Sequence, residues 1–215
     1  LTMGSYSDNS SSGIIESNNN FSSNQFTDYT LMAYRKYNVI YRVKRNGKWF
    51  VLKGLNNEYK GNIFFTKLLD KEFDVAYNLD HPNIAHVYER CNDPLIGECI
   101  VMEYVDGITL NDFIKRNPSL KIKRKIVNEI LDAMSYYHSK QIIHRDLKPS
   151  NILIAHNGNN VKIIDFGLSD SDYYTIFKQP AGTLEYAAPE QLVENNKVDN
   201  RVDIYAFGKI LELLF

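Results

Sequence analysis

The pattern of apolar and polar residues changes its period along the chain. Strand-like patterns occur at four places in the first half: 38–45, 48–55, 84–91 and 98–105. The first two flank Asn46-Gly47, a dipeptide typical of a tight hairpin turn. Residues 62–79 carry apolar side chains at helical spacing, and His81-Pro82 is expected to stop this helix. The chain up to residue 105 is therefore predicted to be mostly strands with one helix.

The second half has a mainly helical pattern. Helices are predicted at 109–117, 119–140 and 201–215, and short strands at 151–155 and 161–165. The longest helix has a regular apolar stripe at Ile122, Ile126, Ile130, Met134 and Tyr137. We therefore expect a β-rich lobe at residues 28–103 and a helical lobe at residues 104–215, joined near Glu103 to Gly107.

Residues 1–27 differ from the rest of the chain. They are rich in Ser and Asn and poor in aliphatic residues. Such a segment cannot bury enough apolar surface to offset the entropy lost on ordering. We expect a disordered tail at residues 1–27, with regular structure beginning near Tyr29.

Composition argues against some classes of protein. The 215 residues carry a net charge of -1, whereas a general nucleic-acid binder usually has a basic surplus. No apolar run approaches the roughly 20 residues that cross a bilayer, and no secretory signal opens the sequence. We therefore expect a cytoplasmic protein that has neither nucleic acid nor membrane as a partner.

The two cysteines, Cys91 and Cys99, flank a predicted hairpin connection. They could face each other, so a cross-strand disulfide is one alternative. Two buried free thiols are favoured, because nothing else in the sequence indicates an oxidising compartment. No group of Cys and His residues has the spacing of a zinc site.

One short loop concentrates polar groups between two apolar runs. In IIHRDLKPSNILI, residues 142–154, the polar residues include Asp146, Lys148 and Asn151. Asp165 follows the next apolar strand. Two carboxylates and an amide close together can bind a hard cation through oxygen atoms, and the neighbouring lysine suits an anionic substrate.

Two charged residues of the first half complete this set. Lys53 lies in a strand within FVLK, and Glu72 lies on the following predicted helix. A cation site with lysines nearby points to phosphoryl transfer, which depends on positioning and charge neutralisation more than on covalent chemistry.

Five motifs occur in a fixed order between about residue 30 and residue 215: FVLK, HRDLKPSN, DFG, GTLEYAAPE and DIYAFG. In these motifs and their order the chain resembles the eukaryotic-type protein kinases of the serine/threonine class. The resemblance implies an α+β, bilobal kinase-like fold, with a small β-rich N-lobe that includes one helix and a mainly helical C-lobe that ends early. It also implies ATP and Mg²⁺ as cofactors and a protein as substrate.

The resemblance assigns chemical roles to the polar loop and the DFG motif. Asp146 matches the catalytic base, which accepts the proton of the substrate hydroxyl group. Lys148 matches the residue that steadies the transferred phosphoryl group. Asn151 and Asp165 match the ligands of Mg²⁺.

The resemblance also assigns the ATP-binding residues. Lys53 matches the residue that holds the α- and β-phosphates, and Glu72 matches the residue that orients Lys53. Met102 falls at the gatekeeper position, and the backbone of Glu103 and Val105 would face adenine. The expected ATP contacts outside the polar loop are Ile40, Val51, Met102, Glu103, Val105 and Leu153.

Residues 165–190 correspond to the activation segment of the family. Thr175 is a candidate phosphorylation site, and its phosphate would pair with Arg145. Thr183 matches the threonine that contacts the catalytic base in serine/threonine kinases.

Two further residues, one within the polar loop and one in the predicted helix 201–215, are expected to be structural. His144 is predicted to be a packed imidazole that donates no proton in the reaction. Asp203 is predicted to fix the backbone of the loop by hydrogen bonds.

The chain departs from the family where the ATP phosphates are covered. The glycines of the family's G-x-G-x-x-G loop fall here on Ala33, Arg35 and Asn38. A side chain costs about 1–2 kcal/mol where a left-handed backbone is required, so weaker or slower nucleotide binding is expected. Arg35 itself offers guanidinium donors to a phosphate.

The second departure is at the end of the sequence. The family continues with several helices beyond the one that carries Asp203, whereas this sequence stops at Phe215. Apolar residues of 205–215 are then expected to be exposed. Two explanations stay open: a fragment, or a reduced form of the fold covered by a partner or by its own dimer.

Two functions are compatible with these observations. The first is a serine/threonine protein kinase that transfers the γ-phosphate of ATP to protein hydroxyl groups with Mg²⁺, which the intact polar residues favour. The alternative is a pseudokinase or nucleotide-binding scaffold module with little or no transferase activity. The missing loop glycines and the short helical lobe favour this alternative.

Overall fold

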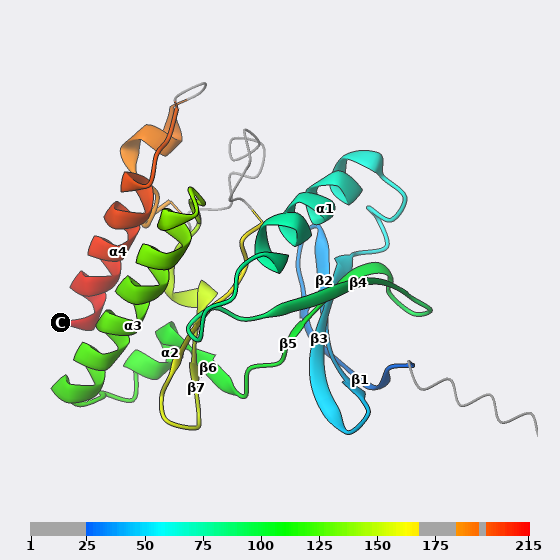
Figure 1. Cartoon of the computed structure of the whole chain (residues 1–215), viewed down its shortest axis with the longest axis horizontal. Coiled ribbons are helices and arrows are strands. Elements are labelled where there is room, and N and C mark those ends of the chain that lie inside the picture. Colours follow the sequence, from blue (N-terminus) through cyan, green and yellow to red (C-terminus); the bar gives the residue numbers. More distant parts are fainter. Residues whose placement is uncertain (1–24, 168–183, 194–196) are drawn as a thin grey trace, which may run out of the picture.

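The computed structural model describes residues 25–167, 184–193 and 197–215, which form two adjoining parts (Figure 1). One part is a sheet with one helix, and the other is mainly helical with a small second sheet. This arrangement is the α+β, two-lobed architecture that the sequence predicts.

The first part is a five-stranded antiparallel sheet in the order β1-β2-β3-β5-β4. Its strands are β1 (Thr27–Tyr34), β2 (Asn38–Arg45), β3 (Lys48–Leu55), β4 (Val87–Asp93) and β5 (Gly97–Glu103). The single helix of this part, α1 (Ile63–Tyr77), contacts β3, β4 and β5. The helix therefore lies where its side chains can meet those of the central strands.

The β2–β3 hairpin forms as predicted. The two strands occupy residues 38–45 and 48–55 and pair without a register shift. Asn46 and Gly47 have φ angles of 52° and 77°. A two-residue type I′ turn requires positive φ at both positions, and Asn and Gly adopt it at the least cost.

Helix α1 begins at a cap and ends earlier than predicted. The Asn62 side chain accepts hydrogen bonds from the backbone N–H groups of Phe64 and Phe65 at 3.0 and 3.4 Å. At the other end, the Asn78 side chain donates to the Asp74 carbonyl at 2.8 Å. Because this amide satisfies a carbonyl of the last turn, the helix ends at Tyr77 and does not continue toward the expected stop.

The sheet begins slightly earlier than the sequence suggests. Strand β1 starts at Thr27 instead of Tyr29. Phe26 is buried, with its ring centroid 6.2 Å from that of Phe50 in an edge-to-face arrangement. Residues 25–27 of the predicted tail thus belong to the folded part, and residues 1–24 lie outside the described residues.

The second part is mainly helical. Its helices are α2 (Leu110–Ile114), α3 (Leu120–Ser139), α4 (Arg201–Leu214) and two 3₁₀ helices, η1 (Pro149–Asn151) and η2 (Pro189–Leu192). A three-stranded antiparallel sheet, in the order β6-β7-β8, consists of β6 (Gly107–Thr109), β7 (Ile152–Ala155) and β8 (Val161–Ile163). The sequence does not predict β6, because three residues are too few to establish a period.

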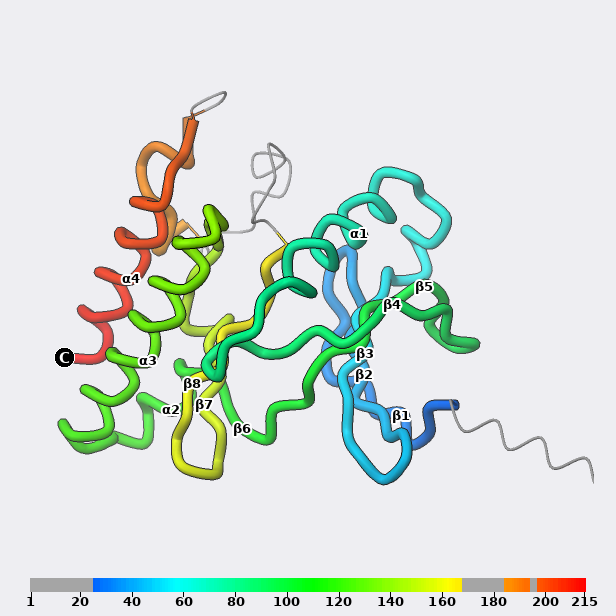
Figure 2. Tube along the Cα trace, viewed as in Figure 1, coloured from blue at the N-terminus to red at the C-terminus, as the bar shows by residue number. Residues whose placement is uncertain are grey.

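Backbone hydrogen bonds join the two parts. After α1 the chain reaches β8 before it returns along β4 (Figure 2). There the Ala85 N–H donates to the Ile163 carbonyl at 2.9 Å, and the Ile163 N–H donates to the Asn83 carbonyl at 2.8 Å. One apolar core runs across the junction, and it includes Leu69 of α1 and Tyr137 of α3. This shared core fixes the walls of the cleft described below.

Helices α3 and α4 lie side by side (Figures 1 and 2). The predicted stripe on α3 faces the core, since Ile126, Ile130, Met134 and Tyr137 are buried and Ile122 is partly buried against them. Helix α4 instead has apolar residues on two faces. Ile210 and Leu214 are buried, whereas Leu213 and Phe215 are exposed, as expected for this segment.

Cys91 and Cys99 are direct neighbours on β4 and β5. Their sulfur atoms are 3.1 Å apart, and both thiols are free. Cys99 is buried as predicted, whereas Cys91 is partly exposed.

Across the described residues, no helix combines the length and apolar character needed to span a bilayer.

Candidate active site

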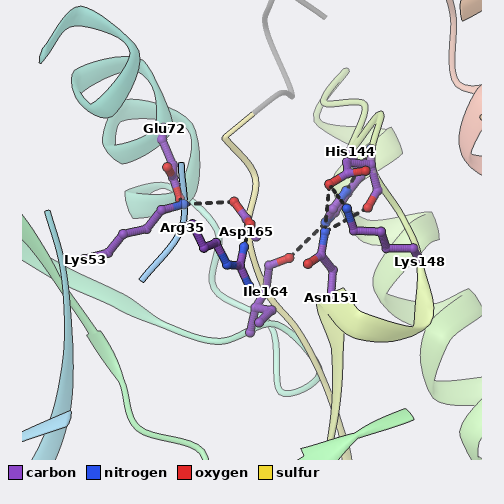
Figure 3. A network of polar contacts seen from close by, with 9 residues as sticks. Arg35, Lys53, Glu72, His144, Lys148, Asn151, Ile164 and Asp165 are labelled. Atoms are coloured by element: carbon purple, nitrogen blue, oxygen red, sulfur yellow. Dashed lines mark hydrogen bonds and ion pairs between the residues drawn. The ribbon is translucent and has the colours of Figure 1, made fainter. Parts of the chain in front are cut away.

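A hollow of about 430 Å³ lies between the two parts of the molecule. The charged and amide residues predicted for phosphoryl transfer all line it: Lys53, Glu72, Asp146, Lys148, Asn151 and Asp165. Figure 3 shows Lys53, Glu72 and Asp165 close together, and Asn151 and Lys148 in a second group beside them. The fold therefore brings together residues that come from β3, α1, the polar loop and the segment after β8.

Lys53 is the centre of the first group. Its ammonium nitrogen is 2.6 Å from Glu72 Oε1 and 2.9 Å from Asp165 Oδ1. Burial by itself would lower the pKa of Lys53, but the charges of Asp165 and Glu72 outweigh burial and raise this pKa above its ordinary value. Lys53 is therefore fixed as a cation that two carboxylates share.

Asp165 links both parts of the site. Its second oxygen, Oδ2, is 3.2 Å from Nη1 of Arg35. Burial would raise the pKa of Asp165, but the positive charges of Lys53 and Arg35 hold it well below 3.8. The residue has a φ of 69°, an uncommon backbone conformation for a side chain other than glycine. The surrounding contacts thus keep Asp165 ionised and turned into the cleft.

Gly167 is the small residue that this cluster needs. A β-carbon at this position would lie 3.0 Å from Glu72 Oε2 and 3.3 Å from Asp165 Oδ1. At such distances the carboxylates would have to shift by a few tenths of an ångström. The last residue of DFG therefore leaves room for the ion pairs.

The polar loop forms the second group. Lys148 Nζ is 2.8 Å from Asp146 Oδ2. The Asn151 amide nitrogen donates to the backbone carbonyl of Asp146 at 2.9 Å and to its Oδ2 at 3.0 Å. Asp146 is thus held by its own loop in an orientation that leaves its side chain on the hollow.

Asp203 fixes the backbone of the loop, as predicted. This carboxylate is buried on α4 and accepts the backbone N–H groups of His144 and Arg145 at 2.8 and 2.9 Å. Its Oδ2 is also 2.9 Å from His138 Nε2. Arg145 has a φ of 63°, and its hydrogen bond to Asp203 holds this uncommon conformation in place.

His144 is the packed imidazole that the sequence suggests. It is fully buried, its Nε2 lies 3.0 Å from the Ile164 carbonyl, and its ring centroid is 4.7 Å from that of Phe166. Gln191 of η2 also supports this loop, because its side chain donates to the Arg145 carbonyl at 2.9 Å. The sequence does not reveal this role of Gln191, since its partner is 46 residues away.

The donor set fits a magnesium ion. Asn151 is 1% exposed, and within the described structure its Oδ1 atom accepts no hydrogen bond. A buried acceptor without a partner is costly, and a cation would satisfy it. No cluster of three or more His, Cys, Asp or Glu residues suited to a metal occurs in the described part of the chain. Mg²⁺ usually needs only one or two carboxylates besides substrate phosphates. Asp165 would supply one carboxylate, and Asn151 would add an amide oxygen.

Six further residues are predicted to contact ATP, and five of them lie on strands of the two sheets. Ile40 pairs with Lys53, Val51 with Met102, and Leu153 lies on β7. Six of the predicted ATP contacts are not among the residues that line the 430 Å³ hollow: Ile40, Val51, Met102, Glu103, Val105 and Leu153. Their assignment as ATP contacts stays a prediction.

The loop without glycine has an ordinary backbone. Ala33, Arg35 and Asn38 are described, and none of them is among the residues with positive φ. The conformational penalty considered for these side chains therefore does not arise in this structure.

Sequence reasoning missed Asn56, whose buried side chain donates to the carbonyls of Arg35 and Lys36. An Asn at the end of a strand signals a turn, but it does not identify a partner 21 residues away.

Thr175 and Thr183 lie outside the described residues. Their predicted roles in the activation segment therefore stay predictions.

Known proteins with similar sequences are protein kinases. The protein kinase domain family matches residues 36–215. Serine/threonine-protein kinase PrkC of Bacillus subtilis (strain 168) is 38% identical over 169 residues, which are 76% of this chain and 26% of that protein. Serine/threonine-protein kinase cds1 of Schizosaccharomyces pombe is 33% identical over 187 residues, 79% of this chain and 39% of that protein.

A third relative gives the same result. Serine/threonine-protein kinase PknB of Mycolicibacterium smegmatis is 39% identical over 153 residues, 66% of this chain and 24% of that protein. The chain thus spans between 24% and 39% of the length of these three relatives.

Proposed function

Because the chain belongs to the protein kinase domain family, we propose that it is a serine/threonine protein kinase, which transfers the γ-phosphate of ATP to a hydroxyl group of a protein substrate with Mg²⁺. The observation that carries this proposal is the convergence of Lys53, Asp146, Asn151 and Asp165 on one hollow. The names of the relatives support the serine/threonine class.

Asp146 is the proposed catalytic base. In the reaction, the substrate hydroxyl oxygen forms a bond to the γ-phosphorus while the bond from that phosphorus to the leaving oxygen of ADP breaks. The hydroxyl proton passes to the Asp146 carboxylate. Lys148, which is 2.8 Å from this carboxylate, supplies a positive charge next to the transferred group.

Lys53 and Glu72 are the proposed positioning pair for the nucleotide. Glu72 holds the ammonium group of Lys53 at 2.6 Å, so the cation is oriented before any phosphate arrives. A preoriented charge needs no reorganisation during the reaction. Asn151 Oδ1 and the Asp165 carboxylate would hold Mg²⁺, and that ion would neutralise charge on the phosphate oxygens.

The alternative is a nucleotide-binding module with little or no transferase activity. One observation favours it: Arg35 occupies the position of a family glycine and pairs with Asp165, the carboxylate proposed for the metal. The Arg35 side chain of this pair is 49% exposed and that of Asp165 is 21% exposed, so solvent partly screens the pair. A bound metal and triphosphate can displace it, so we favour the kinase.

An assay of phosphate transfer tests the proposal. The chain is incubated with radiolabelled ATP, Mg²⁺ and a generic protein substrate, and incorporation is compared with that of Asp146→Asn. We expect this variant to lose activity by about 10²- to 10⁴-fold, since it cannot accept the proton. Asp74→Asn, on the exposed face of α1, is the control and should keep its activity. Equal incorporation by wild type and Asp146→Asn would reject the kinase in favour of the nucleotide-binding module.

A further inference from the structure

The loop between β1 and β2 is held in place by one buried residue. The Asn56 side chain donates to the carbonyls of Arg35 and Lys36 at 3.1 and 2.5 Å, and the Asn56 N–H donates to the Tyr37 carbonyl at 2.9 Å. The Arg35 N–H donates to the Asn38 carbonyl at 2.8 Å. Three consecutive carbonyls therefore face the protein, and the loop is fixed without glycine.

Aromatic contacts fix the tip of the loop as well. The Tyr37 ring stacks on Phe65 of α1, with centroids 4.8 Å apart and planes inclined by 24°. It also meets the edge of Tyr59 at 5.0 Å. Because the loop is attached to α1 and to the end of β3, the side chain of Arg35 starts from a defined position above the cleft.

Arg35 extends from this loop toward the centre of the site (Figure 3). Its Nη1 is 3.2 Å from Asp165 Oδ2, and Lys53 Nζ is 2.9 Å from the other oxygen of the same carboxylate. Two cations of the sheet part, one from β3 and one from the loop between β1 and β2, thus meet at Asp165. The side chain of Lys53 is 8% exposed, whereas that of Arg35 is 49% exposed and can exchange its partner.

We propose that Arg35 binds the terminal phosphates of ATP, so that a guanidinium group performs here the task that backbone N–H groups perform in the glycine loop of the family. This inference rests on the proposed function for the identity of the nucleotide. The planar guanidinium matches two phosphate oxygens at once, and a phosphate group carries more negative charge than the carboxylate that Arg35 leaves. Solvent screens the existing pair with Asp165, so the exchange favours the phosphate.

Equilibrium binding tests this role without reference to catalysis. The dissociation constants of ATP, ADP and adenosine are measured by calorimetry with the whole chain, in Mg²⁺ and again in EDTA. We expect Arg35→Ala to weaken ATP binding about tenfold in both conditions, the size typical of a partly screened charged hydrogen bond. ADP should lose less, and the affinity for adenosine should change by less than about twofold, because adenosine has no phosphate.

Three variants separate the guanidinium from general charge. Lys44→Ala removes the same charge from β2, at a side chain that lies over the Trp49 ring, and should leave ATP binding unchanged. Arg35→Lys keeps the charge without the planar guanidinium group. It should lose about half of the ATP-binding free energy that Arg35→Ala loses. Arg35→Gly restores the family residue and should also bind ATP more weakly than wild type, since the loop backbone is fixed by Asn56.

Several outcomes would overturn the proposal. Tighter ATP binding by Arg35→Ala or Arg35→Gly would identify Arg35 as an obstacle on Asp165. An equal loss of ATP affinity in Lys44→Ala would show that the effect of Arg35→Ala comes from net charge alone. An unchanged affinity in Arg35→Ala, with transfer that still depends on Asp146, would reject this inference and leave the kinase standing. Conversely, loss of ATP affinity in Arg35→Ala without any transfer by wild type would support the phosphate contact and reject the kinase. Failure of wild type to bind ATP would reject both.

Discussion

The two halves of the cleft are held together by different forces. On the sheet side, Lys53 pairs with Glu72, and both Lys53 and Arg35 pair with Asp165, whose charge joins the two parts of the molecule. On the helical side, the polar loop is held by backbone hydrogen bonds to the buried carboxylate of Asp203. The first arrangement depends on the relative position of several elements, and the second depends on one helix and the loop beside it.

This difference separates the parts that can respond to a ligand from those that cannot. The hydrogen bonds of Asp203 are shielded from solvent, so we expect the polar loop to keep its shape when a nucleotide binds. In the pair between Arg35 and Asp165 the Arg35 side chain is half-exposed, and solvent or a phosphate can compete for it. We therefore expect variants on the sheet side to change both binding and stability, and variants of Asp203 to act mainly through stability.

The largest expected effect comes from breaking the buried ion pairs of the sheet side. Lys53→Met leaves Glu72 buried next to Asp165 without a cation, and we expect a loss of about 3–5 kcal/mol in the free energy of unfolding. Urea denaturation at pH 7 measures it. Lys162→Met, which removes a more exposed pair with Glu103, should cost about 1 kcal/mol or less.

A double variant sharpens this result. Adding Glu72→Leu to Lys53→Met removes both charges of the buried pair, and we expect it to recover much of the lost stability. If Lys53→Met were no less stable than Lys162→Met, the sheet side would not depend on charge pairing as described.

The next effect concerns the helical side. Asp203→Ala leaves the backbone N–H groups of His144 and Arg145 without their acceptor, and we expect a loss of about 2–4 kcal/mol. The measurement is again urea denaturation, with Asp74→Ala on the exposed face of α1 as control at less than about 0.5 kcal/mol. A similar small loss for both variants would mean that the loop holds its shape without Asp203.

A pH titration tests the charges around Asp165. The pKa of Asp165 in the folded protein lies below 3.8, its ordinary value. Between the folded pKa and pH 3.8, the unfolded chain therefore binds a proton that the folded chain does not. The stabilising contribution is therefore complete above about pH 4 and is lost as the pH falls toward the folded pKa.

The comparison is between wild type and Asp165→Asn. We expect wild type to be more stable at pH 6 by about 1–2 kcal/mol, and we expect this difference to shrink below about pH 4. Urea denaturation at several pH values provides the data. A difference that grows on acidification would contradict the assigned direction of the shift.

The smallest effect concerns the helix that carries Glu72. Asn62→Ala removes the side-chain cap of α1, and we expect a loss of about 1 kcal/mol. Ser119 occupies the same position at α3, but its side chain makes no capping hydrogen bond in the described structure. Ser119→Ala should therefore cost less than about 0.5 kcal/mol in the same thermal or urea unfolding experiment. Equal losses would show that these caps do not distinguish the two helices.

Much of the fold could be predicted because its signals are local. The hairpin around Asn46-Gly47 forms at the predicted residues, and the apolar stripe of α3 faces the core. The end of α1 was misjudged, because an Asn78 side chain satisfies the last turn before the proline is reached. Short elements such as β6 have too few residues to show a period.

The charged residues of the site could also be identified from their motifs. Lys53, Asp146, Asn151 and Asp165 stand out as chemical types at characteristic spacings, and they do line one hollow. The supporting residues could not be identified in this way. Asn56 and Gln191 are single amides whose partners are 20 or more residues away, and many other arrangements would have been equally consistent with their sequence positions.

The sequence by itself determined the order of the elements, the charged residues proposed for phosphoryl transfer, and the absence of glycine at three loop positions. Only the tertiary structure decided that the loop needs no positive φ there and that Arg35 meets Asp165 across 130 positions of chain. The reason is physical: periodicity and turn chemistry act between near neighbours, whereas a pair of distant side chains meets only after the core has packed and fixed both backbones.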